Sequence, residues 1–241
     1  LRASSRFALA HALWARDRLP QARDMMAAAA AALRMNPDYR RDVMAFLQSS
    51  QAQLFSQMGN HDLALNMARA AYDALTPRTR GDYRVNVVST LAWELVTAAR
   101  HNDAAALVEA EFSDPAFFDQ LMPDLQIQSL RARASLQDIT YHPETASALL
   151  DQADAIAAAH TTVSVVQRIA LLWDRGVQLR NAGRYEPALR SLAAANDAYF
   201  AERAKVAAAS TSGQAASLSQ DMERVLGELT VAWWLYEERT N

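Results

Sequence analysis

Residues 172–195, LWDRGVQLRNAGRYEPALRSLAAA, decide how this chain folds. The stretch predicts one helix, a tight turn at residues 181–183 and a second helix that packs back on the first. Small residues stand where the two helices must touch, at Gly176 before the turn and at Ala188 after it. A fainter copy at residues 51–71, QAQLFSQMGNHDLALNMARAA, places small residues at the same offsets. The sequence therefore predicts a helical hairpin that occurs more than once.

One small residue just inside the second helix of each hairpin marks the repeat. The expected markers are separated by 42, 42, 40 and 42 residues, and they are Ala22, Ala64, Ala106, Ala146 and Ala188. A nearly constant spacing over five markers indicates a repeat array. The small residues and the turn glycine resemble the tetratricopeptide repeat (TPR). The period is longer than the roughly 34 residues of the standard repeat, and it resembles the long-helix variants of kinesin light chains and of sensory regions in bacterial regulators.

The resemblance implies an all-α fold, a right-handed superhelix of about five antiparallel helical hairpins with a C-terminal capping helix. We expect residues 1–206 to form the array and residues 207–241 to form a linker and the capping helix (217–238), within one continuous domain. Residues 113–122 are expected to be irregular. The expected helix pairs are 4–15 with 20–33, 38–57 with 61–75, 83–100 with 103–112, 124–139 with 143–159, and 161–179 with 186–206.

Composition limits the function further. A formal net charge of −3 leaves no basic footprint for nucleic acid, and no uninterrupted apolar run is long enough to span a membrane. The absence of cysteine excludes disulfides and thiolate metal sites, and it leaves the compartment open between cytoplasm and periplasm. The chain begins at Leu1 without a methionine or a signal-like segment, so we expect a fragment or processed form of a longer protein. The resemblance to sensory regions of bacterial regulators implies a flanking effector domain. The oligomeric state stays open.

No catalytic motif is found in the sequence. There is no glycine-rich phosphate loop, no HExxH pair and no nucleophile elbow, so we expect no enzyme, no cofactor and no metal. The histidines are interpreted as solvated or capping residues at turns, Glu111 as part of a solvated acidic group, and Trp93 and Trp173 as packing residues. Arg78, Arg80 and Arg84 form a basic cluster that either holds an acidic partner segment or lies on an ordinary exposed loop.

The first helix of each hairpin carries a polar stripe. In TPR arrays these helices line the concave face, where extended peptides or helices dock. The carboxylate clamp of some family members is not visible, because the only lysine, Lys205, lies outside this face. The residues predicted to contact a ligand are His11, Trp14, Gln53, Asn86, Thr90, Glu94, Gln128, Arg131, Ser135, Asp138, Asp174 and Gln178.

Two interpretations of the stripe stay open, a solvent-facing side and a binding groove. The groove interpretation predicts a protein- or peptide-binding scaffold or sensor domain within a larger bacterial regulatory or signalling protein. The alternative function is a sensor that closes around a small ligand or signalling peptide. It predicts an enclosed pocket near Trp14, Gln53, Glu94 and Arg131.

Overall fold

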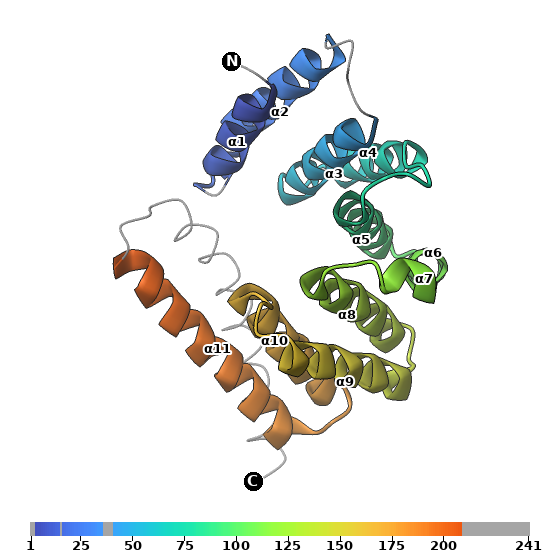
Figure 1. Cartoon of the computed structure of the whole chain (residues 1–241), viewed down its shortest axis with the longest axis vertical. Helices are drawn as coiled ribbons and strands as arrows, with labels where there is room; N and C mark the ends of the chain where they lie inside the picture. Colours follow the sequence, from blue (N-terminus) through green and yellow to red (C-terminus); the bar gives the residue numbers. More distant parts are fainter. Residues whose placement is uncertain (1–2, 15, 36–40, 209–241) are drawn as a thin grey trace. The chain divides into compact units, whose positions relative to one another are not determined.

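The chain folds into α-helices that pair as antiparallel hairpins (Figure 1). The computed structural model describes residues 3–14, 16–35 and 41–208, and the regular elements in these ranges are all helices. The chain divides into two compact units, Leu1–Gln120 and Leu121–Asn241. In the first unit lie α1 (Ala3–Trp14), α2 (Leu19–Arg34), α3 (Arg41–Gln57), α4 (His61–Asp73), α5 (Gly81–Thr97), α6 (His101–Phe112) and α7 (Pro115–Phe118). In the second unit lie α8 (Pro123–Ile139), α9 (Pro143–Ala159), α10 (Val165–Asn181) and α11 (Tyr185–Ala208).

The five hairpins of the described chain turn through the same backbone conformation. After each first helix, a single residue adopts a left-handed φ of 55–77°. The amide of the residue that follows it donates to the carbonyl five residues earlier, at 2.8–3.0 Å. This is the Schellman ending of a helix. The left-handed residues, 42, 40, 42 and 42 positions apart, are Asp17, Gly59, Ala99, Tyr141 and Gly183.

The second helices also begin alike, which corrects one marker of the repeat. In each, a buried alanine donates its amide to the carbonyl of the residue that follows the left-handed one, at 2.9–3.1 Å. In the third hairpin this alanine is Ala104, whereas Ala106 is exposed, so the choice of Ala106 was wrong. The third hairpin lacks the turn glycine that Gly59 and Gly183 provide in two other hairpins, and Ala99 stands in its place. The five alanines in this position are Ala22, Ala64, Ala104, Ala146 and Ala188.

Neighbouring hairpins contribute to one another's core. In the first unit Leu54 of α3 packs with Ala10 of α1 and Met26 of α2, and all three are fully buried. Val87 of α5 packs in turn with Ala45 of α3. A hairpin that cannot bury its own apolar face alone is stabilised by the next one, as in other repeat proteins.

The hairpin of α10 and α11 shows why its small residues are needed. Gly176 is buried on α10, and a Cβ there would lie 2.5 Å from Leu192 Cγ and 3.3 Å from the carbonyl oxygen of Ala188. Ala188 and Ala195 of α11 are fully buried. The prediction that these small residues mark the helix–helix contact is confirmed.

The structure also bears on the irregular segment and on the linker that the sequence predicts. Residues 113–122, expected to be irregular, contain the one-turn helix α7, because the Asp114 carboxylate accepts a hydrogen bond from the Ala116 amide at 2.9 Å and Pro115 opens the helix. Helix α11 continues to Ala208, two residues into the expected linker. The capping helix expected at residues 217–238 lies outside the described residues, and the right-handed superhelix stays a prediction.

Candidate functional site

In the first unit, predicted site residues join the first helices of successive hairpins. Gln53 of α3 donates from Nε2 to Thr90 Oγ1 of α5 at 2.7 Å. Ser49 of α3 donates to Asn86 Oδ1 at 2.7 Å, and its hydroxyl lies 2.9 Å from that of Thr90. Three predicted residues are therefore brought together, but much of their hydrogen-bonding capacity is used inside the protein.

The second unit has an ion pair at the same place in the repeat. Arg131 of α8 donates from Nε to the Asp174 carboxylate of α10 at 2.6 Å and from Nη1 to Gln167 Oε1 at 3.1 Å. Arg131 and Ser49 each lie ten residues before the left-handed residue of their hairpin, and Asp174 and Thr90 each lie nine before theirs. The same pair of repeat positions thus carries a hydroxyl network in the first unit and a salt bridge in the second.

A second pair of equivalent contacts lies near the turns. The Trp14 indole donates from Nε1 to Gln57 Oε1, and Asn181 donates from Nδ2 to the Asp138 carboxylate at 2.5 Å. The His11 ring lies beside that of Trp14, with centroids 5.5 Å apart and planes tilted by 34°, and burial lowers the pKa of its imidazole. Trp14 and Asp138 therefore contribute to contacts between successive first helices, whereas the ring contacts of His11 lie within α1.

Glu94 differs from the other predicted residues. Its side chain, on α5 one turn after Thr90, is 1% exposed. Neither carboxylate oxygen makes a hydrogen bond of standard geometry with a described residue, although the Ser56 hydroxyl lies near enough to favour the charged form. Burial raises the pKa of Glu94, and the nearby Ser56 hydroxyl and His61 imidazole oppose this shift only in part. A buried acceptor without a well-placed donor is costly, so the Glu94 carboxylate is a poorly satisfied polar group of this face.

Solved structures share this arrangement of hairpins, whereas no family model and no curated protein matches the sequence. One is a STAND signal transduction ATPase with a tetratricopeptide repeat sensor from Pyrococcus horikoshii, which is 12% identical, with a TM-score of 0.63 over 97% of this chain and 37% of that chain. The fold is that of TPR proteins. The apo form of RapI is 15% identical, with a TM-score of 0.59 over 96% and 84% of the two chains. PilF from Pseudomonas aeruginosa is 14% identical, with a TM-score of 0.54 over 95% of each chain.

Within the TPR-like hairpins, the predicted stripe is more than a solvent-facing side. Thr90, Glu94, Asp174 and Gln178 are buried, and Gln178 donates from Nε2 to the Pro143 carbonyl at 3.4 Å. Gln128 is half-buried, and Ser135 is exposed. Ligand contact by any of these residues stays a prediction.

The pocket of the alternative function also stays a prediction. Trp14, Gln53 and Glu94 belong to the first unit, whereas Arg131 belongs to the second. The residues predicted to contact a ligand did not include four members of these contacts, Ser49, Gln57, Gln167 and Asn181. The signal that could have found Gln57 is its distance of 43 residues from Trp14, which equals the distance between Asp138 and Asn181.

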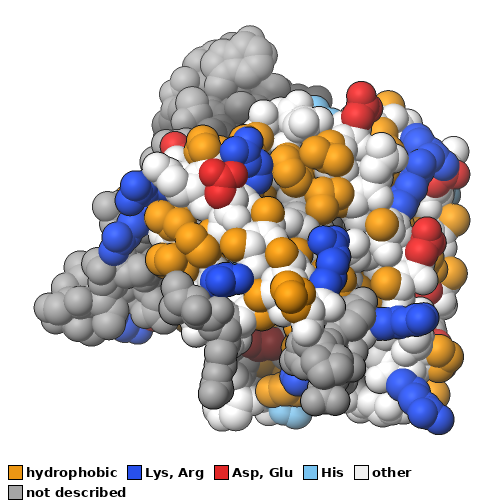
Figure 2. Space-filling model, turned by 90° about the horizontal axis from the view of Figure 1, so that it is seen from above, with side chains coloured by type: hydrophobic (Ala, Val, Ile, Leu, Met, Phe, Trp, Pro, Cys, Tyr) orange, Lys and Arg blue, Asp and Glu red, His pale blue; other side chains and the backbone are white. Residues whose placement is uncertain are grey.

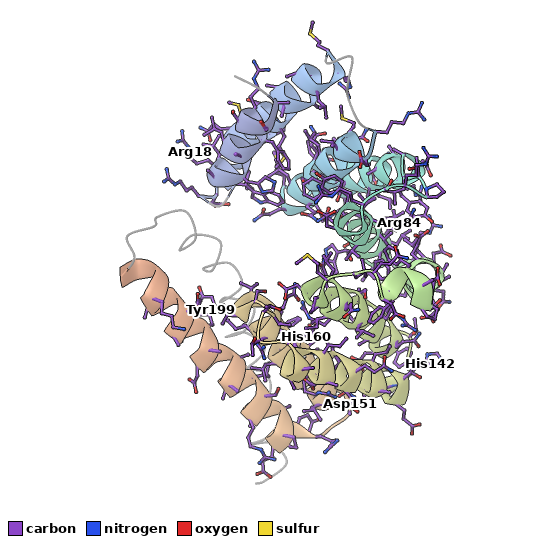
Figure 3. The ribbon with its side chains drawn as sticks, viewed as in Figure 1. Arg18, Arg84, His142, Asp151, His160 and Tyr199 are labelled. Atoms are coloured by element: carbon purple, nitrogen blue, oxygen red, sulfur yellow. The ribbon has the colours of Figure 1, made fainter. Side chains whose placement is uncertain are left out.

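In the basic cluster, the positive charges of Arg80 and Arg84 are paired with carboxylates of the same chain. Arg84, labelled in Figure 3, donates from Nη1 to the Glu111 carboxylate at 2.6 Å, and Tyr72 donates to the same carboxylate at 2.7 Å. Glu111 is half-buried, so its interpretation as a solvated residue was wrong. Burial and the bond to Glu111 raise the pKa of Tyr72 to about 12. Arg80 is bound to Asp82, and Figure 2 shows Lys and Arg side chains scattered over the face that it draws.

The two tryptophans that were expected to be packing residues differ in their burial. Trp173 is half-buried against the cluster of Ile169, Ala195 and Tyr199, which confirms it as a packing residue. Trp93 is exposed, so its interpretation as a packing residue was wrong.

Among the residues that the structure describes, no three His, Asp or Glu side chains are grouped to hold a metal ion, and no helix is long and apolar enough to cross a membrane.

Proposed function

We propose that this chain is a protein- or peptide-binding TPR-like domain, and that the first helices of its hairpins form the binding face. The observation that carries the proposal is the repetition of polar contacts between successive first helices, Ser49 with Thr90 in one unit and Arg131 with Asp174 in the other. These contacts hold polar side chains in fixed rows before any partner binds. A surface that is already ordered loses little conformational entropy on binding, which favours affinity for an extended segment.

We also propose that the domain serves as a sensor or scaffold in a larger regulatory protein. The similar structure from Pyrococcus horikoshii is a signal transduction ATPase whose sensor is a tetratricopeptide repeat, and this chain spans 37% of that protein. A sensor domain needs a binding face and a means to pass a change to an effector. Small shifts between stacked hairpins are a physical route for such a change.

A selection experiment tests the binding face. The full chain is immobilised and panned against a displayed library of random 12-residue peptides, and an enriched peptide is resynthesised. Hydrogen exchange with and without this peptide should show protection on first helices, α3 and α5 or α8 and α10. Protection confined to second helices, or no enriched peptide, would refute the proposal.

Matched variants locate the face independently. Thr97→Trp on α5 and Ser135→Trp on α8 add a large side chain at exposed positions of first helices. Ala110→Trp on α6 and Ala148→Trp on α9 do the same on second helices. At least one first-helix variant should weaken the peptide about tenfold or more, which is about 1.4 kcal/mol, while both second-helix variants should bind normally.

A further inference from the structure

Glu94 lies on the α5 face that meets α3 and the start of α4. Thr90, one turn earlier, is bonded to Gln53 of α3, and the groups that act on the Glu94 carboxyl are Ser56 of α3 and His61 of α4. The Ser56 hydroxyl and His61 Nδ1 are 3.4 Å apart. His61 is exposed and Ser56 is half-buried, so the carboxyl lies close to the surface at the turn end of these helices.

Other hairpins of the chain show that packing does not require a carboxylate at this place. Glu94 stands five residues before its left-handed residue. The same position holds Leu54 and Leu136, which are buried, and Gln178, whose amide donates to the Pro143 carbonyl. Leucine fills the position without an unmet polar group, and glutamine has a donor of its own. The carboxylate of Glu94 therefore has a cost that the two leucines avoid and that the uncharged Gln178, with one unmet oxygen, has to a smaller extent.

A cation from outside the chain would remove this cost. Inside the described part of the chain, the basic group that acts on Glu94 is the imidazole of His61, and no group of three carboxylates and imidazoles is placed to hold a metal ion. A lysine or arginine side chain suits the position, because its flexible stem can reach a recessed acceptor and its charged head brings several N–H donors. A charge-assisted hydrogen bond in a desolvated place is stronger than one in water.

We propose that Glu94 is the acceptor for a basic side chain, lysine or arginine, of a peptide segment bound along the first helices of the first unit. This inference rests on the proposed peptide-binding function and adds the chemistry of the partner. The partner segment displaces the side chains over Glu94 and pairs its cation with both carboxylate oxygens. Pairing also lowers the pKa of Glu94, which burial raises in the free chain.

The test uses the peptides enriched on the full chain. Each is resynthesised with citrulline in place of arginine, or with norleucine in place of lysine, so that the charge is lost and the length is kept. The same peptides are measured by calorimetry against the wild type, Glu94→Gln, Glu94→Leu and the control Glu144→Gln. Glu144 is exposed on α9, so its substitution changes the net charge equally without touching the buried site.

We expect the loss of the peptide cation and the loss of the Glu94 carboxylate to weaken binding by the same amount. Removing the peptide cation should weaken binding about tenfold or more, and Glu94→Gln or Glu94→Leu should weaken it equally, which is about 1.4 kcal/mol. The two changes together should weaken binding no further, while Glu144→Gln should bind like the wild type. Unfolding is followed in the same samples, because a loss of affinity in a more stable variant cannot come from misfolding.

Two outcomes would overturn the inference. Enriched peptides that bind the Glu94→Leu variant with unchanged affinity, or that carry no basic residue, would show that the face binds peptides without this pairing, and the proposed function would stand. The absence of any enriched peptide would refute both proposals together.

Discussion

At the scale of single residues, Glu94 links stability to pH. Because burial raises its pKa in the folded state, the unfolded chain releases this proton at a lower pH than the folded chain does. The contribution of Glu94 to stability is therefore most favourable below the unfolded pKa of about 4.5 and falls as pH rises through the raised folded value. Above that value the full penalty of a buried charge is present.

Replacing Glu94 by leucine should remove this penalty. Glu94→Leu copies the residue found at the equivalent positions 54 and 136, so the side chain has a precedent in the same fold. We expect a gain of roughly 1–3 kcal/mol at pH 8, the usual cost of an unmet buried polar group, and a smaller gain at pH 4. Urea denaturation at pH 4, 6 and 8 measures it, with Glu144→Gln as the exposed control. A gain that does not depend on pH would contradict this account.

The left-handed turn residues make a second prediction at this scale. Ala99 has a φ of 58° with a Cβ, whereas Gly59 has a φ of 77° without one. Ala99→Gly should stabilise the chain by roughly 0.5–1 kcal/mol, since a left-handed residue with a Cβ costs about 1–2 kcal/mol and glycine adds unfolded-state entropy. Thermal denaturation measures the shift.

The reverse change is the matched control. A Cβ added to Gly59 would meet nothing within 4 Å, so Gly59→Ala isolates the backbone cost. It should destabilise the chain by about 1 kcal/mol. Equal melting temperatures for both variants and the wild type would show that these turns tolerate a Cβ freely.

At the scale of elements, Gly176 sets how closely α10 and α11 approach. A Cβ at this position would lie 2.5 Å from Leu192 Cγ and 2.7 Å from Cδ2. Gly176→Ala should destabilise the chain by roughly 1–3 kcal/mol through overpacking, although alanine gains up to about 1 kcal/mol in helix propensity.

A double-mutant cycle separates the two effects. In a Leu192→Ala background the contacts with Leu192 are removed and the 3.3 Å approach to the Ala188 carbonyl oxygen remains, so Gly176→Ala should then be close to neutral. Chemical denaturation of the four proteins measures the coupling. Additive effects of the two substitutions would mean that the contact with Leu192 does not limit the approach of the helices.

The sequence reveals a helix pair where a glycine and spaced small residues coincide, as at Gly176, Gly183 and Ala188. The start of the second helix is harder to predict where a residue other than glycine occupies the left-handed turn position. Ala99 adopts the left-handed conformation without being glycine, and in this hairpin Ala106 was chosen in place of Ala104. Glycine is therefore a helpful but not a necessary signal, since the turns at Asp17 and Tyr141 also lack it and their markers Ala22 and Ala146 were predicted correctly.

At the scale of the whole molecule, the partner of each polar side chain depends on the stacking of hairpins. The polar stripe of the first helices is visible in the sequence, but the pairing of Arg131 with Asp174 joins residues 43 positions apart. Only the register between hairpins decides that Thr90 and Asp174 occupy the same place. The burial of Glu94 depends on the same register, so a residue expected at an open groove was found enclosed.

Stacked repeats are stabilised mainly by nearest-neighbour contacts, so damage to one contact should stay local. Asp174 is buried beside Arg131, and Arg131→Met would remove that guanidinium and cost about 3 kcal/mol. Hydrogen exchange should accelerate in α8, α9, α10 and α11 and remain unchanged in α1, α2, α3 and α4. Asp174→Leu in the same background should restore part of the protection, because a buried carboxylate is then removed as well. Faster exchange throughout the chain would instead show that the array unfolds as one cooperative whole, and the description of the fold as a sum of neighbouring hairpins would fail.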